Sequence, residues 1–84
     1  MSLEKEILSL NAISRSVLRE CATPNIEEKV LRRYLAVVNS QLGHVEKMGV
    51  YPLSPETQGA YLAAITLAET ARSNLQYRLF KAEC

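Results

Sequence analysis

Histidine is the side chain best suited to acid–base chemistry near neutral pH, and the sequence holds one, His44. Catalytic use of His44 would need a carboxylate to orient the ring and a nucleophile or substrate pocket beside it. Glu46 is two residues away, on a different face of a helix, and Glu28 is too distant along the chain. A metal site usually needs three or four ligands, and no second histidine or nearby cysteine is present. The sequence therefore predicts a solvated or boundary histidine and no metal site.

The adjacent pair Glu27 and Glu28 could be a paired-carboxylate site. Neighbouring residues of a helix point about 100° apart, so these carboxylates do not converge on one substrate atom. In the first turn of a helix they are stabilised by the free backbone N–H groups. No Gly-rich phosphate loop, Cys-x-x-Cys pair or nucleophile elbow occurs in the sequence. We therefore expect no enzyme activity and no cofactor.

Cys21 and Cys84 are the only cysteines, and they lie far apart in the sequence. Two cysteines do not make a disulfide scaffold, so we expect free thiols in a reducing compartment. Cys21 is expected to be a small buried apolar residue, and Cys84 to lie in a frayed end. The first residues include Glu4, Lys5 and Glu6, which is unlike the basic start of a signal peptide. We expect a cytoplasmic protein without membrane contact, unless a dedicated secretion system exports it.

Lys29, Arg32 and Arg33 form the most basic segment and could contact phosphates. Glu28 stands beside them, and the net charge of the chain is only +1. Basic residues interleaved with acidic ones differ from the footprint of a groove-binding protein. A small nucleic-acid-binding transcriptional regulator that uses this basic face is therefore the alternative function, and a solvated face is the favoured interpretation.

The elements that position these residues are helices. The 84 residues are 48% hydrophobic and 23% charged, which is typical of one globular domain. Every acidic residue is Glu, which helices tolerate better than Asp, and Gly and Pro are few. Thr23-Pro24, or Asn25 with Glu28 as a capping box, can start a helix, as can Ser54-Pro55. Gly49 suits a left-handed helix end. These signals predict helices at about 3–21, 24–48 and 55–82.

Each helix carries an apolar face. The first has a heptad seam, the second an arc about 160° wide, and the third an alanine-rich strip. A lone hydroxyl such as Ser14 in the first seam can bond the carbonyl four residues earlier. We predict an all-α three-helix bundle, built on a long antiparallel hairpin of the second and third helices and open to dimerisation. The seam is Leu3, Ile7, Leu10, Ser14, Val17 and Cys21; the strip is Ala60, Ala64, Ala68, Ala71, Leu75 and Ala82.

Leu62, Tyr77 and Phe80 fall on the side of the third helix opposite the alanine strip. Such exposed apolar residues on a small protein indicate an interface, although the first helix could also cover them. Leu3, Ile7 and Leu10 are the next candidates, because their seam could pair with another chain. At the hairpin tip, Tyr51 and Leu53 could offer a contact, but folding back over the bundle end is favoured.

The favoured function is a non-catalytic protein-binding adaptor, chaperone or regulator, whose partner is another protein or a second copy of the chain. In size and outline the chain resembles the small co-chaperones of bacterial type III secretion. It also resembles the short helical connector proteins of bacterial stress and biofilm regulation. Both resemblances are of shape alone and imply only that a helical face binds a protein.

Overall fold

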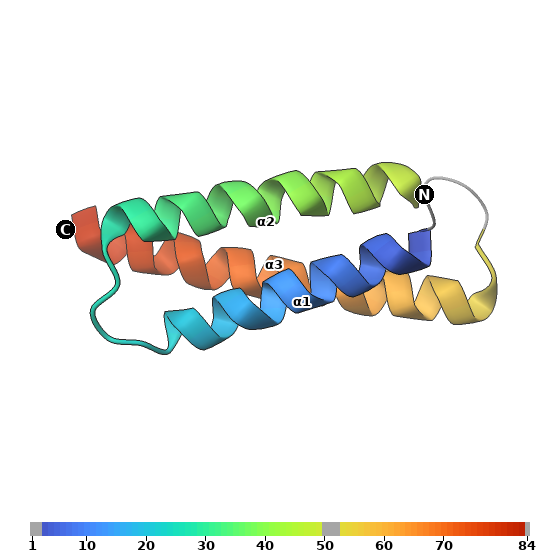
Figure 1. Ribbon diagram of the computed structural model, residues 1–84, viewed down its shortest axis with the longest axis horizontal. Coiled ribbons are helices and arrows are strands. Elements are labelled where there is room, and N and C mark those ends of the chain that lie inside the picture. The colour runs from blue at the N-terminus through green and yellow to red at the C-terminus, as the bar shows by residue number, and fades with distance from the viewer. Residues whose placement is uncertain (1–2, 50–52, 84) are drawn as a thin grey trace.

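Three helices lie side by side along the long axis of the molecule (Figure 1). The computed structural model describes residues 3–49 and 53–83, with the backbone alone at 82 and 83. The helices are α1 (Leu3–Cys21), α2 (Glu28–Met48) and α3 (Pro55–Glu83). α1 and α3 run in one direction and α2 in the other, and every pair of helices is in contact. The predicted all-α bundle with an antiparallel α2–α3 hairpin is confirmed, and α1 packs within the same chain.

α3 sets the length of the bundle. Its 29 residues, at about 1.5 Å each, span the 44 Å of the longest axis. Its predicted start is confirmed, since the Thr57 amide donates to Ser54 Oγ at 3.2 Å and Pro55 is the first helical residue. None of the helices in the described ranges is long and apolar enough to cross a membrane.

α2 begins at Glu28, four residues later than predicted. Neither of the expected caps forms: Glu27 is the N-cap residue, its backbone is extended, and its side chain caps no amide. In a helix starting at residue 24, the Thr23 and Pro24 carbonyl groups would accept from amides farther along the helix. Instead, both accept from the Arg78 guanidinium of α3, at 3.0 and 3.5 Å. A tertiary contact therefore replaces the first turn of the predicted helix.

Gly49 ends α2, as predicted, but not in the left-handed conformation. Its φ of −84° and ψ of 6° are open to other residues, and its amide donates to Val45 O and Glu46 O. The need for glycine comes from packing instead. A Cβ added at this position would lie 2.4 Å from Cε2 and Cζ of the Tyr61 ring. The absence of a side chain at Gly49 lets the Tyr61 ring lie against the end of α2.

We predict that Gly49→Ala lowers the free energy of unfolding by about 1–2 kcal/mol, because the new methyl group overlaps the Tyr61 ring. Gly43→Ala is the matched control on the same helix, since its added Cβ meets no atom within 4 Å. That change should raise the free energy of unfolding by up to about 1 kcal/mol through helix propensity. Urea denaturation measures both. In a Tyr61→Ala background the penalty of Gly49→Ala should disappear; an unchanged penalty there would contradict the steric explanation.

The core runs along the axis between the three helices. Leu10 of α1, Val38, Leu42 and Val45 of α2, and Leu75 of α3 are fully buried. Ser14 is buried among them, and its Oγ donates to Leu10 O at 2.7 Å, which confirms the expected back-bond. The alanine strip is confirmed at Ala64, Ala68, Ala71 and Leu75, all without exposed surface; Ala60 is exposed. Alanines on α3 allow close approach of the neighbouring helices.

Candidate functional site

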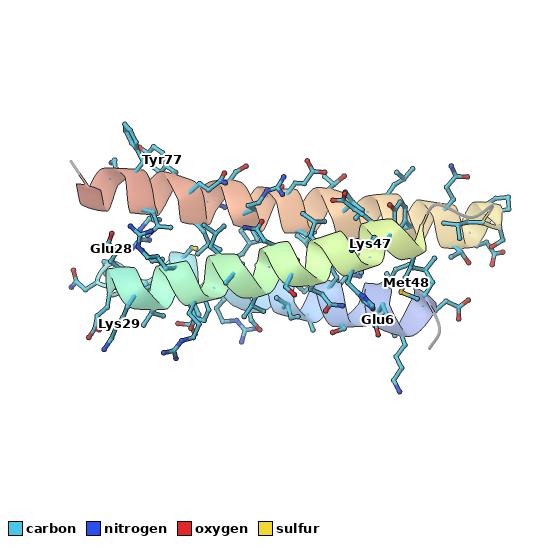
Figure 2. The ribbon with its side chains drawn as sticks, turned by 90° about the horizontal axis from the view of Figure 1, so that it is seen from above. Glu6, Glu28, Lys29, Lys47, Met48 and Tyr77 are labelled. Atoms are coloured by element: carbon cyan, nitrogen blue, oxygen red, sulfur yellow. The ribbon has the colours of Figure 1, made fainter. Side chains whose placement is uncertain are left out.

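The basic segment at the start of α2 is paired with acids of the same helix end. Lys29 Nζ lies 3.6 Å from Glu27 Oε2, and Arg32 Nη2 donates to Glu28 Oε1 at 2.8 Å. Figure 2 labels Glu28 and Lys29 at this end of α2. Arg33, the third candidate for phosphate contact, is exposed. Two of the three cations thus have a carboxylate beside them, which lowers the local positive potential available to a nucleic acid.

His44 contacts an acid that the sequence does not suggest. Its Nε2 lies 3.7 Å from Glu6 Oε2 of α1, and Gln41 Nε2 donates to the same oxygen at 2.8 Å. The Glu6 side chain is largely buried at this position, with 16% exposed. The contacts hold one carboxylate between α1 and α2, so they tie two helices together. In the described ranges, no group of three histidine, cysteine or acidic residues could hold a metal ion.

Cys21 lies at the end of α1, half-buried against the core rather than fully buried. Its thiol is free. Burial raises the pKa of the Cys21 thiol, and the charge of Arg78 acts in the opposite direction. A raised pKa leaves little thiolate at neutral pH, so the group is a poor nucleophile. Tyr51 and Cys84, two other predicted residues, lie outside the described ranges, and Leu53 is half-buried.

The first-helix seam belongs to the core and is not a free surface. Ile7 and Leu10 are buried, and Leu3 packs against the core. The prediction that these residues contact a partner is therefore corrected: α1 turns this face toward α2 and α3. A heptad seam predicts that a helix pairs, but it does not say whether the mate lies in the same chain.

Leu62, Tyr77 and Phe80 lie on the solvent side of α3, as the sequence predicts. Their exposed fractions are 54%, 57% and 65%. Tyr77 points away from both other helices in Figure 2, and Lys81 Nζ lies 5.2 Å from the centre of its ring. Leu62 and Phe80 are 18 residues apart, about 27 Å along the helix, so they share one side of α3 without touching.

A second apolar surface, which the sequence did not indicate, is a shallow groove between α1 and α2. It has a volume of about 390 Å³ and an apolar floor that includes Ile13, Val17, Tyr34 and Val37. Glu20 and Arg33 stand in its lining, one from each helix. The groove depends on how two helices cross, and periodicity within either helix does not contain that information.

Two polar residues of structural importance were also missed. Glu6 and Arg78 each contact groups more than thirty positions away in the sequence. Local spacing cannot reveal such pairs, although a charged side chain at the edge of an apolar helix face is a weak signal for them. Comparison of the chain with protein-family models, curated proteins and solved structures gives no match.

Proposed function

We propose that this chain is a non-catalytic protein-binding module, of the adaptor, chaperone or regulator kind, whose contact surface is the outer side of α3. The proposal rests on Leu62, Tyr77 and Phe80, three large apolar side chains that the bundle leaves more than half exposed on one helix. Aromatic residues with open surroundings are the usual anchors of protein interfaces.

The distribution of charge supports the same surface. Between Glu56 and Arg72 the sequence has one charged residue, Glu69. Charged residues are depleted at the centres of protein interfaces, because burying them removes their hydration. The part of α3 around Leu62 therefore loses little hydration when a partner covers it, whereas at the other end Lys81 lies beside the Tyr77 ring.

The rigidity of α3 lowers the entropy cost of binding at this surface. A helix of 29 residues that is anchored on the core by Ala64, Ala68, Ala71 and Leu75 holds its outer side chains at fixed positions. Little backbone entropy is then lost on binding. A helix of the partner could pack along α3 and contact its exposed side chains at intervals of three and four residues.

The residues whose side chains could take part in chemistry have structural roles in this proposal. Glu6 joins His44 and Gln41 across α1 and α2, and the raised pKa of Cys21 keeps its thiol protonated. The proposed function accordingly requires binding and no bond-making step.

The test is affinity capture from extract of the native cell, comparing the wild-type chain with Leu62→Ser/Phe80→Ser. We expect each substitution to cost about 2 kcal/mol of binding, or about 30-fold in affinity, if these residues are anchors. Capture should therefore be lost in the double variant. Circular dichroism should show unchanged helicity, because both side chains are exposed.

A matched control replaces two exposed apolar residues of the other helices, Leu8→Ser/Val37→Ser, with exposed fractions of 69% and 44%. This variant should capture the same proteins as the wild-type chain. The proposal is wrong if Leu62→Ser/Phe80→Ser captures normally, or if it unfolds and so shows that these side chains support the fold.

A further inference from the structure

The outer side of α3 carries a second heptad seam, opposite the one that faces the core. Its positions alternate by four and three residues, all are exposed and none is charged. Counted at 100° per residue, this outer seam lies about 160° from the buried alanine strip. Any line along a helix has this spacing, so the distinguishing features of this one are its lack of charge and its two aromatic side chains. The outer seam consists of Gly59, Ala63, Thr66, Thr70, Ser73, Tyr77 and Phe80.

The outer seam is graded in size. Gly59 and Ala63 stand at one end and Tyr77 and Phe80 at the other, with Thr70 near the middle. The exposed Leu62 borders the small end, at the same angle around the helix as Phe80. Two such seams fit best in opposite directions, because the aromatic end of each then covers the small end of the other and Phe80 of one copy approaches Leu62 of the second. A parallel pair would place aromatic against aromatic and leave a gap between the glycines.

We infer that a second copy of this chain packs antiparallel on the outer seam, with the two-fold axis near Thr70. The inference rests on the proposed function and names the partner for the same surface. A two-fold contact uses one patch on both copies, so a patch that is complementary to itself when reversed is what such an interface needs.

The two threonine hydroxyls at the middle of the seam are already satisfied within α3. Thr66 Oγ1 donates to Leu62 O at 2.9 Å, and Thr70 Oγ1 donates to Thr66 O at 3.0 Å. A buried hydroxyl without a partner would cost free energy, and these two hydroxyls avoid that cost. Thr66 and Thr70 can therefore lose their water without leaving a donor unpaired.

Charges at the two ends fit the antiparallel direction. Glu56 and Lys81 are both exposed and lie within about 20° of each other around the helix axis, at opposite ends of α3. In an antiparallel pair, Glu56 of one copy approaches Lys81 of the other, twice per dimer. A parallel pair would bring like charges together. Glu69 lies at the edge of the seam near the two-fold axis, where the Glu69 side chains of the two copies repel each other through solvent.

The expected dimer is weak. One pair of helices buries less than the roughly 800 Å² per partner of a standard interface. We expect a dissociation constant on the order of 10 μM. Sedimentation equilibrium from about 1 to 500 μM covers this range. The mass should rise from 9.4 kDa toward twice that value across the series. Leu62→Ser/Phe80→Ser should remain monomeric, whereas Leu8→Ser/Val37→Ser should associate like the wild-type chain.

The relative direction of the two α3 helices in the dimer is tested by cross-linking single cysteines with a short bis-maleimide, in a Cys84→Ser background. Ala63→Cys and Asn74→Cys replace exposed residues 11 positions apart, about 17 Å along the helix and within about 20° of each other around it. In the antiparallel dimer each variant alone stays unlinked, and the two mixed together form a linked pair. Cys84→Ser alone controls for the half-buried Cys21, whose raised pKa makes it slow to react.

Charge reversal gives an independent readout. Glu56→Lys should weaken self-association several-fold, Glu56→Lys/Lys81→Glu should restore it, and Glu69→Gln should strengthen it.

Linking of each cysteine variant with itself would overturn the antiparallel arrangement, and a monomer at every concentration would overturn self-association. If the chain is monomeric but Leu62→Ser/Phe80→Ser still loses captured proteins, the proposed function stands and only this inference fails. If the chain is monomeric and Leu62→Ser/Phe80→Ser captures the same proteins as the wild-type chain, both the proposed function and this inference are wrong.

Discussion

Leu10→Ala should lower the free energy of unfolding by about 3 kcal/mol. Leu10 has no exposed surface and lies in the core between α1 and the other two helices. Its truncation removes buried methyl groups and leaves a cavity that close-packed neighbours fill only in part. Domains of this size have only about 5–15 kcal/mol of stability in total, so the loss is large. Chemical denaturation followed by circular dichroism measures it.

Leu8→Ala is the control for this change. Leu8 lies two residues away on α1 and is 69% exposed. The same atoms are removed and the same helix propensity is gained, so the difference between the variants isolates burial. The Leu8 variant should unfold within about 0.5 kcal/mol of the wild-type chain.

The comparison also separates the two roles open to the first-helix seam. If the seam paired with another chain, Leu10→Ala would reduce association and leave the monomer stable. If it forms the core, Leu10→Ala destabilises the monomer at every protein concentration. Equal stabilities for the Leu8 and Leu10 variants would contradict the packing of α1 described above.

What the sequence could predict was information local to one helix. Ser54 followed by Pro55 marks the start of α3, because capping involves groups within one turn. The alanine strip at 64, 68 and 71 marks the buried side of α3, because periodicity is a property of a single helix. The exposed positions of Leu62, Tyr77 and Phe80 follow from the same periodicity, since a side opposite the core faces solvent.

What the sequence could not predict was which distant groups meet. Thr23-Pro24 has the local chemistry of a helix start, yet the carbonyl groups that this start needs are bound to Arg78. His44 has an acidic contact, but it is Glu6 on another helix, not the nearer Glu46. Glycine is needed at position 49 because the Tyr61 ring lies where a side chain would be, not because of the backbone angles. In each case a tertiary contact overrides a local preference.

Arg78→Met should lower the free energy of unfolding by about 2 kcal/mol. The guanidinium of Arg78 donates to the carbonyl oxygen of Cys21, the last residue of α1, and to those of Thr23 and Pro24 in the connection that follows. The Cys21 carbonyl carries part of the negative charge of the helix end, so a cation there has a favourable field as well as hydrogen bonds. Hydrogen bonds to a charged group contribute about 1.5–3 kcal/mol, less where water competes, as it does at the exposed Thr23.

Two variants control for charge and for side-chain length. Arg72→Met makes the same replacement six residues earlier on α3, away from the end of α1, and should cost less than about 0.5 kcal/mol. Arg78→Lys keeps the positive charge but replaces the planar fork by a point donor. It should recover less than half of the loss, because one ammonium group cannot reach three carbonyl groups with the same geometry. Equal unfolding midpoints for Arg78→Met and the wild-type chain would exclude this role.

The same variant should also move the start of α2. With Arg78 gone, the Thr23 and Pro24 carbonyl groups are free to accept from amides of the chain that follows, and Pro24 is well placed as a first helical residue. Backbone chemical shifts of residues 24–27 should then move toward helical values. The Cys21 thiol gives a second readout: the nearby positive charge lowers its pKa against the effect of burial. Removing the Arg78 charge raises the pKa of the Cys21 thiol further and slows thiol alkylation in a Cys84→Ser background. Unchanged shifts at 24–27 together with unchanged alkylation would mean that another contact holds this end of the bundle.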